Sequence, residues 1–298
     1  MLSIFSVPKP FRGHIEIIQR NAISSWLRVH PHCEIILCGN EPGTEQTAAE
    51  FKVRYIPNID RNNYGTPLLN SVFDQVGRIA SHRLLCYVNA DILLLGDFLC
   101  ALQRIRFPRF LMVGQRWNVD LNTPWDFERA DWEERLRGYV ANYGALHPPS
   151  GSDYFVFPRG SAIEKLPPFA VGRPGWDNYL IYKARHLGIP VVDATRVVTV
   201  VHQNHDYAHV ANQQGEWWEG PEADWNRSLL GGRDHIFTLL DATHLMRSRL
   251  LLPAVGYPYL RRRWQTLSML APTTRPLGGF LNRIPARLRS WLRFVRSQ

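Results

Sequence analysis

A buried strand that runs into Asn89-x-Asp91 is the part of the chain best suited to chemistry. The residues from Leu84 to Val88 are mostly apolar, and a second apolar run follows Asp91. A carboxylate at the end of a buried strand is costly unless something binds it. A divalent cation that holds a diphosphate is the natural partner, because hard cations take carboxylate and phosphate oxygens together. The alternative is that Asp91 caps the following turn.

A second candidate cluster is rich in histidine. His202, His205 and His209 lie within eight residues, directly after a β-branched run. Imidazole is a common metal ligand, so the cluster predicts metal binding. The alternative for His205 and His209 is hydrogen bonding to loop backbone. A zinc hydrolase built on His202, His205 and Asp206 is an alternative, but it would leave Asn89-x-Asp91 unexplained. The HExxH helix typical of such enzymes is absent from the sequence.

Two further acidic residues stand at the start of regular elements. Asp153 begins a predicted strand, and Asp177 lies in the first turn of a predicted helix. The helix dipole alone favours a carboxylate at that point. Trp176, beside it, either stacks on a sugar ring or fills the core. The sequence has no GxGxxG, no GxxxxGK[ST] and no serine nucleophile elbow, so it lacks the usual signatures of dinucleotide, P-loop and serine-hydrolase sites.

Alternating strands and helices must position these residues. Up to about residue 115, the pattern predicts strands at 3–7, 34–38, 53–56, 83–88 and 110–113, and helices at 15–27, 44–51, 67–79 and 98–105. Beyond it, the pattern predicts a loop at 117–127, helices at 131–140 and 176–186, and strands at 153–157, 191–194 and 197–201. Such alternation predicts an α/β fold with a Rossmann-like, mostly parallel sheet. Ligands are expected at the carboxyl ends of its strands.

The order of these features resembles the A-type glycosyltransferases, which use nucleotide-diphospho-sugars, and in particular a bacterial and plant group of them. The likeness covers roughly residues 1–243 and is carried by YVNADILL, GSDYFVFPRG, GWDNYLIYKAR and VVHQNHDY. It implies the A-type fold, a nucleotide-sugar donor, a Mn²⁺ or Mg²⁺ cofactor and a glycan or lipid-linked acceptor. It leaves the sugar and the acceptor unidentified.

The resemblance also implies a role for each candidate residue. Metal ligation falls to Asp91 and His202, with His205 in reserve. Asn89 stands where the family has an aspartate and would contact the ribose. Acceptor contact falls to Asp153 and Trp176, and Asp177 would be the general base of an inverting transfer. The remaining donor contacts are Ser6, Pro8, Asn40 and Glu41.

Two other functions compete with this interpretation. Asn89 in place of an aspartate is compatible with a non-catalytic protein that binds a sugar nucleotide or a glycan. Nucleotidyl transfer would require a dense cluster of glycine and basic residues after the first strand. That loop offers only Lys9, Arg12 and Gly13.

Composition and charge place the basic residues at one end of the chain. The 298 residues are 45% hydrophobic and 12% aromatic, which excludes disorder. Residues 242–298 hold eleven Arg and no acidic residue, whereas the remainder balances 24 basic against 26 acidic residues. Specific nucleic-acid binding by the body is therefore not expected. We expect a catalytic domain at 1–250, with a nucleotide-binding half (1–115) and an acceptor half (116–250), and a basic tail at 251–298.

The tail predicts an amphipathic helix at 283–296 that binds an anionic membrane surface. Packing on the catalytic domain or on a second copy is an equal alternative, and nonspecific RNA binding is a third. The sequence lacks a signal peptide and a membrane-spanning run, and its four cysteines, without CxxC spacing, suit reduced, buried thiols. We therefore expect a cytoplasmic protein, peripheral at the inner face of the membrane.

Overall fold

The computed structural model describes residues 1–205, 219–232, 235–248 and 250–270. The chain divides into two units, Met1–Ala254 and Val255–Gln298. The first unit holds all the strands of the described residues, and the described part of the second forms one helix, Tyr257–Leu270. The tail helix expected at 283–296 lies outside the described residues.

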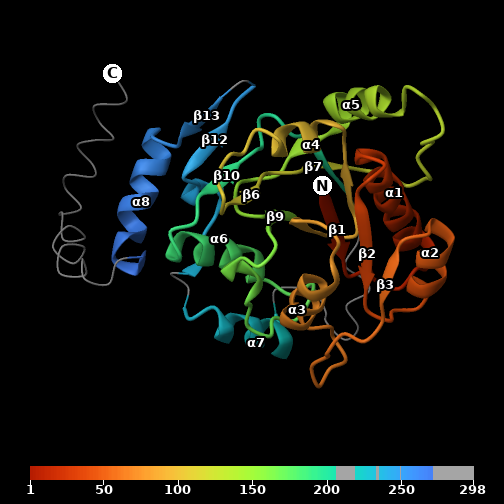
Figure 1. The fold of residues 1–298 in the computed structure, drawn as a ribbon, viewed down its shortest axis with the longest axis horizontal. Helices are drawn as coiled ribbons and strands as arrows, with labels where there is room; N and C mark the ends of the chain where they lie inside the picture. The colour runs from red at the N-terminus through yellow and green to blue at the C-terminus, as the bar shows by residue number, and fades with distance from the viewer. Residues whose placement is uncertain (206–218, 233–234, 249, 271–298) are drawn as a thin grey trace. The chain divides into compact units, whose positions relative to one another are not determined.

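The strands and helices follow one another as Figure 1 labels them. The strands are β1 (Leu2–Ser6), β2 (Glu34–Cys38), β3 (Arg54–Ile56), β4 (Leu84–Val88), β5 (Ile92–Leu94), β6 (Leu111–Val113), β7 (Trp117–Val119), β8 (Ala145–Leu146), β9 (Tyr154–Pro158), β10 (Val191–Asp193), β11 (Val200–Gln203), β12 (His244–Met246) and β13 (Leu251–Pro253). The α-helices are α1 (Gly13–Val29), α2 (Thr44–Phe51), α3 (Leu69–Ile79), α4 (Asp97–Leu102), α5 (Trp132–Tyr143), α6 (Trp176–His186), α7 (Pro221–Leu229) and α8 (Tyr257–Leu270). Two short 3₁₀ turns are η1 (Ala162–Glu164) and η3 (Leu239–Asp241).

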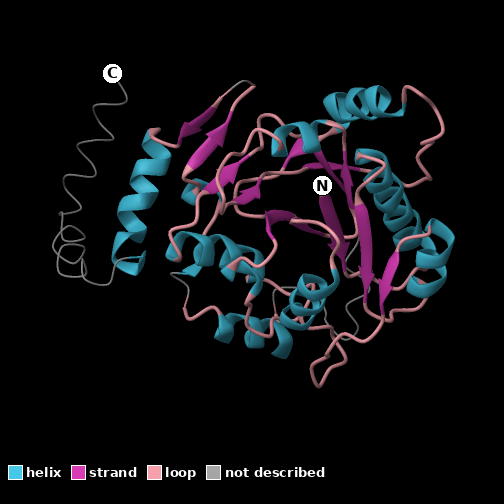
Figure 2. Cartoon of the chain, viewed as in Figure 1, coloured by secondary structure: helices cyan, strands magenta, loops and turns pink. Residues whose placement is uncertain are grey.

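The main sheet has nine strands in the order β13-β12-β10-β6-β9-β4-β1-β2-β3, and it crosses the centre of the first unit (Figures 1 and 2). Most neighbours are parallel, while β9 runs antiparallel to β4 and β6, and β13 to β12. The expected α/β class with a mostly parallel sheet is confirmed.

Both faces of the main sheet are buried under helices. On one face, Ile4 of β1 and Cys86 of β4 join a cluster that includes Trp26 of α1 and Phe98 of α4. On the other face, the ring of Phe5 lies 5.2 Å from that of Phe73 in α3. The alternation of side chains along each strand produces these two cores. Because helices cover both faces of the sheet, a ligand can reach its strands only at their ends.

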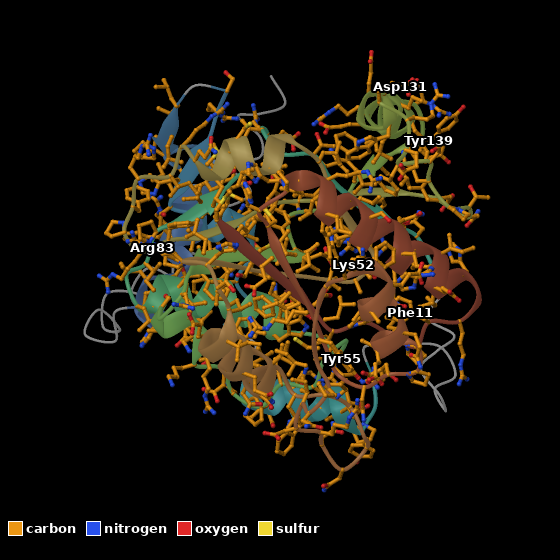
Figure 3. The ribbon with its side chains drawn as sticks, turned by 45° about the vertical axis from the view of Figure 1, so that its right-hand side comes forward. Phe11, Lys52, Tyr55, Arg83, Asp131 and Tyr139 are labelled. Carbon is orange, nitrogen blue, oxygen red and sulfur yellow. The ribbon has the colours of Figure 1, made fainter. Side chains whose placement is uncertain are left out.

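A second, four-stranded sheet, β5-β11-β7-β8, lies beside the first. Strand β7 occupies part of the 117–127 segment that we expected to be a loop, so that expectation is wrong there. The strand forms because it pairs with β11 and β8, long-range partners that local pattern does not reveal. Helix α5 packs on this sheet, and Figure 3 shows Asp131 and Tyr139 at that helix.

The cysteines only partly match the expectation of buried thiols. Cys38 and Cys86 are buried in strands of the main sheet, whereas Cys33 is half-buried and Cys100 is exposed, and all four are free thiols. Over the described ranges, no helix combines the length and the apolar character needed to cross a bilayer.

Candidate active site

Strand direction brings the predicted donor-binding segments to one edge of the sheet. Strands β1, β2 and β4 are parallel neighbours, so Ser6, Asn40 and Asn89 all lie at their carboxyl ends. Strand β9 runs the opposite way, so Asp153, just before it, lies where β4 ends. The backbone N–H of Asn89 donates to the carbonyl of Asp153 at 2.9 Å. The topology thus assembles the site from loops that are far apart in sequence.

The second sheet supplies the histidines. Strand β5 begins directly after Asp91 and pairs antiparallel with β11, which sets His202 opposite Ile92. As a result Nε2 of His205 lies 3.1 Å and Nε2 of His202 lies 3.8 Å from Oδ2 of Asp91. One ligand atom from each of the three residues lies within 4.8 Å of the others. The structure therefore unites the three residues predicted to bind metal.

Asp91 and His202 have the protonation states of metal ligands. Burial alone would raise the pKa of the Asp91 carboxyl, but His202, a hydrogen bond with His205 and Lys9 hold that pKa below its usual range. Burial lowers the pKa of His202, although Asp91 opposes the shift. An ionised carboxylate and a neutral imidazole are the forms that bind a cation.

Two polar atoms of the cluster have no hydrogen-bond partner among the described residues. Within the described ranges, Oδ1 of Asp91 and Nδ1 of His202 are buried and have no hydrogen-bond partner. A buried polar atom without a partner costs on the order of 1–3 kcal/mol, and a charged one costs more. A bound cation would remove that cost. The donor set of one carboxylate and two imidazoles thus fits a divalent metal.

Asn89 and Asp153 form a polar support beside the cluster. The Asn89 amide donates to Oδ1 of Asp153 at 2.8 Å, and the Arg116 guanidinium donates to its other oxygen. Asp153 is 6% exposed, so this ion pair is largely shielded from water. Two of the predicted sugar-contacting groups, Asn89 and Asp153, thus contact each other.

Trp176 and Asp177 lie in the first turn of helix α6, with Asp177 close to Asp153. The preceding Gly175 has φ of +97°, and a Cβ on it would come within 2.8 Å of Leu230. Burial raises the pKa of Asp177 to about 6, and Asp153 adds to this shift, while backbone N–H groups of Asn178 and Ser152 oppose it. The shift gives Asp177 the pKa of a general base near neutral pH.

Trp176 is 6% exposed, and its ring contacts those of Tyr87 and Phe155 edge-on at 5.0 and 5.5 Å. Of the two roles considered for Trp176, this burial and these contacts favour filling the core, because little of the ring is left exposed to a sugar.

The loops after β1 and β2 form the remaining part of the predicted donor site. Ser6 and Pro8 are buried, and Oγ of Ser6 has no hydrogen-bond partner in the described chain. Arg61, which the sequence analysis did not single out, donates to Oδ1 of Asn40 at 2.5 Å and to Oε1 of Glu41 at 2.9 Å. This arrangement leaves Oε2 of Glu41 buried and unpaired as far as the structure is described.

Sequence reasoning also missed two cations next to the cluster. Nζ of Lys9 lies 3.3 Å from Nε2 of His205, and Arg116 pairs with Asp153. Lys9 was counted only as a sparse basic residue. Its position between Pro8 and Pro10 was the available signal, because two prolines fix the chain on both sides.

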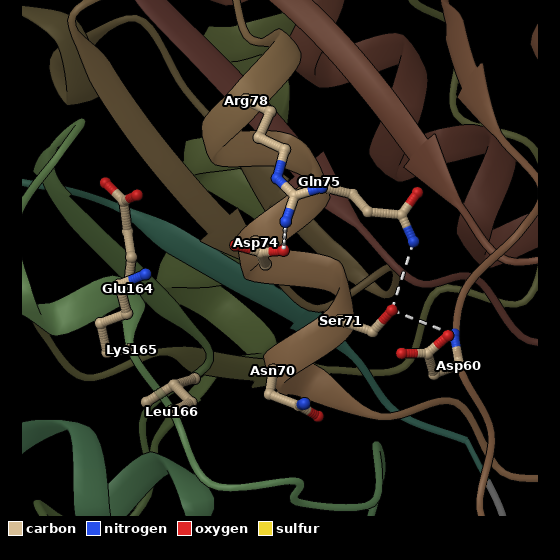
Figure 4. Close-up of a pocket in the computed structure, with 9 residues that line it drawn as sticks. All are labelled: Asp60, Asn70, Ser71, Asp74, Gln75, Arg78, Glu164, Lys165 and Leu166. Atoms are coloured by element: carbon tan, nitrogen blue, oxygen red, sulfur yellow. Dashed lines mark hydrogen bonds and ion pairs between the residues drawn. The ribbon is translucent and has the colours of Figure 1, made fainter.

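A separate cavity of about 560 Å³ lies on the outer side of α3 (Figure 4) and contains none of the predicted site residues. Its charged groups are partly paired, as Arg78 is with Asp74 at 2.5 Å. Ser71 accepts from the backbone of Asp60 and from Gln75. Internal contacts occupy part of its polar lining, although Oδ1 of Asn70 has no partner among the described residues, and we assign the cavity no function.

No family model matches the chain, and no curated protein matches it. Solved structures resemble it distantly. Glucosyl-3-phosphoglycerate synthase from Mycobacterium tuberculosis, in complex with Mg²⁺ and UDP, has 12% identity, covers 78% of this chain and 80% of its own, and has a TM-score of 0.42. The mannosyltransferase PcManGT from Pyrobaculum calidifontis, in complex with GDP-Man and Mn²⁺, has 12% identity, coverage of 97% and 82%, and a TM-score of 0.42. At these values the likenesses do not by themselves assign an activity to the chain.

Proposed function

We propose that the protein is a divalent-metal-assisted glycosyltransferase of the A-type. It would transfer a sugar from a nucleotide-diphosphate-sugar to a glycan or lipid-linked acceptor. The observation that carries this proposal is the Asp91–His202–His205 cluster at the carboxyl ends of parallel strands. That edge of an open α/β sheet is where nucleotides bind.

The residues divide between donor and acceptor. Asp91, His202 and His205 would hold the cation, which when bound supplies Lewis-acid stabilisation of the diphosphate leaving group. Ser6, Pro8, Asn40 and Glu41 lie around the loops that would receive the nucleoside. Asn89, which would contact the ribose, and Asp153, which would contact the acceptor, are joined by a hydrogen bond beside the metal ligands.

Asp177 would act on the acceptor. Its raised pKa makes it a stronger base than an ordinary aspartate, yet still mostly ionised at pH 7. In an inverting transfer the carboxylate would take the proton of the attacking hydroxyl. Trp176 would support this position from the core rather than stack on the acceptor.

The donor can be identified by a ligand screen. Nucleotide sugars of uridine, guanosine, adenosine and thymidine would be tested by thermal shift, with Mn²⁺ and with EDTA. A bound donor stabilises the fold by roughly 2.7 kcal/mol at a hundredfold excess over its dissociation constant. We expect one base to stabilise the protein more in Mn²⁺ than in EDTA. A screen without any such shift would contradict the proposal.

Turnover separates the enzyme from a binding protein that kept the fold. An enzyme should slowly hydrolyse the identified donor to free sugar and nucleoside diphosphate when Mn²⁺ is present. Donor binding without hydrolysis and without transfer to any acceptor would favour the binding protein.

The cytoplasmic location and the anionic membrane surface remain proposals. The membrane surface is supported by helix α8, on which Leu260 and Trp264 are exposed and which also carries Arg261 and Arg263. At 100° per residue these apolar side chains share one stripe with Tyr257 and Leu267, and the two arginines fall on either flank. Such a helix suits the interface of an anionic membrane, which is where a lipid-linked acceptor would be found.

A further inference from the structure

The backbone of Lys9, a half-buried residue, is fixed by its neighbours in the sequence and by a residue of α1. Lys9 follows β1 and lies between Pro8 and Pro10, whose rings restrict the backbone on both sides. Its N–H donates to Oε1 of Gln19 at 2.6 Å, and Nε2 of Gln19 donates back to its carbonyl at 2.9 Å. Gln19 belongs to α1 and is 1% exposed. Both polar backbone groups of Lys9 are therefore bound to one buried amide.

This clamp directs the Lys9 side chain at the metal-ligand cluster. Nζ of Lys9 lies 3.3 Å from Nε2 of His205, and the same nitrogen lies 3.1 Å from Oδ2 of Asp91. The ammonium group is thus next to the position that a divalent cation would occupy. Two cations so close repel each other strongly at low dielectric, unless an anion lies between them.

The charges of the cluster indicate how negative that anion must be. Asp91 is the one carboxylate among the three ligands, because Asn89 is neutral and Asp153 is already paired with Arg116. Among these described residues, a divalent cation together with Lys9 would bring three positive charges against the one negative charge of Asp91. The diphosphate of a nucleotide sugar carries two negative charges, which matches the two excess positive charges of this described group.

We propose that Lys9 is the second cation of the donor site and binds a non-bridging oxygen of the diphosphate. This inference rests on the proposed function and adds a residue that contacts the leaving group. Lys9 and the metal would contact the diphosphate together, so part of its binding persists without metal. The ammonium would also counter the third negative charge that appears on the diphosphate when the sugar departs.

The test compares nucleoside diphosphate and monophosphate binding by calorimetry, using the base identified in the screen. Wild type, Lys9→Met, Lys9→Arg and Lys165→Met would be measured in saturating Mn²⁺ and in EDTA. Lys165 is an exposed lysine that lines the separate cavity of Figure 4 and serves as the matched control. Near-ultraviolet circular dichroism checks that each variant is folded, and Lys9→Gln replaces Lys9→Met if that variant is not.

We expect Lys9→Met to lose diphosphate affinity on the order of 10- to 100-fold, as for a charge-assisted contact, and to change monophosphate affinity less than threefold. Lys9→Arg should retain most of the affinity, and Lys165→Met all of it. Mn²⁺ alone should bind Lys9→Met at least as tightly as wild type, because a competing cation is gone.

An unchanged ratio of diphosphate to monophosphate affinity in folded Lys9→Met would overturn the inference. So would weaker binding of Mn²⁺ alone, which would mean that Lys9 only positions the ligands. These outcomes differ from failure of the proposed function, in which wild-type protein binds no nucleoside diphosphate at all.

Discussion

Gln203 donates its side-chain N–H to the main-chain carbonyl of Asp91 at 3.2 Å, and its own backbone N–H donates to the same oxygen at 3.2 Å. The Gln203 side chain is completely buried. Its amide also donates to the carbonyl of Ile18 at 2.8 Å and accepts from Asn21 at 2.9 Å. Gln203, the residue directly after His202, therefore fixes the backbone of the metal-binding aspartate to helix α1.

Replacing Gln203 should weaken metal binding without removing a ligand. Gln203→Leu removes the buried hydrogen bond from the Asn21 amide, which then keeps only the Thr123 carbonyl as acceptor, and the loss costs on the order of 1–3 kcal/mol of stability. Loss of such a support typically lowers metal affinity 10- to 100-fold. Mn²⁺ titration at a temperature where the variant is folded measures this. Gln46→Leu, at an exposed position of α2, is the control, and equal Mn²⁺ affinity in both variants would refute the positioning role.

The two imidazoles should favour Mn²⁺ over Mg²⁺, because Mg²⁺ prefers oxygen ligands. His202→Ala should weaken Mn²⁺ binding, whereas His186→Ala, at the exposed end of α6, should not. Competition between the two metals, followed by the electron paramagnetic resonance signal of free Mn²⁺, measures the preference. A site that binds Mg²⁺ as tightly as Mn²⁺ would show that the histidines are not ligands.

Much of this site was predictable because its residues directly follow strands. Asp91, His202 and Asn40 each come after an apolar run, and parallel strands place such residues at one edge. Lys9, Arg116 and the Asn21–Gln203 pair were not predicted. Their roles depend on contacts across 37 to 196 positions in sequence, which periodicity does not encode. The same reason explains why β7 was expected to be a loop.

Asp177 should reduce stability while it supports catalysis. Its pKa of about 6 in the folded protein exceeds its ordinary value of 3.8, so the folded state holds the proton more tightly than the unfolded state. The free energy of unfolding therefore falls as pH rises from about 4 to 6. Asp177→Asn resembles the protonated form, so it should be about 1–3 kcal/mol more stable than wild type at pH 7 and no different below pH 4.

The same variant should lose transfer activity by on the order of 10²–10⁴-fold while retaining donor binding. The wild-type rate should rise with pH through about 6, and Asp177→Asn should lack that rise. Denaturant unfolding and rate measurements from pH 4 to 8 check both effects. A destabilised variant that keeps full activity per folded molecule would reduce Asp177 to a helix-start residue.

Helix α8 should attach the full-length protein to anionic vesicles at low salt. Each arginine near such a surface contributes about 1 kcal/mol to the binding free energy. Insertion of the apolar stripe into the interface strengthens the binding further. The double variant L260E/W264E should weaken sedimentation with phosphatidylserine vesicles, whereas Y64E, at an exposed tyrosine of the first unit, should not. Wild type that sediments with neither anionic nor neutral vesicles would exclude a membrane role. If instead wild type forms dimers in the absence of vesicles and the double variant does not, the apolar stripe binds a second copy of the chain.

Donor hydrolysis by Asp91→Ala tests the central claim most directly. Wild type and variant would be assayed with the identified nucleotide sugar in Mn²⁺ and in EDTA, with circular dichroism confirming that both are folded. We predict that wild type releases nucleoside diphosphate only with metal, and that Asp91→Ala releases none in either condition. Equal turnover by folded Asp91→Ala, or full wild-type turnover in EDTA, would contradict a metal-assisted transfer centred on Asp91.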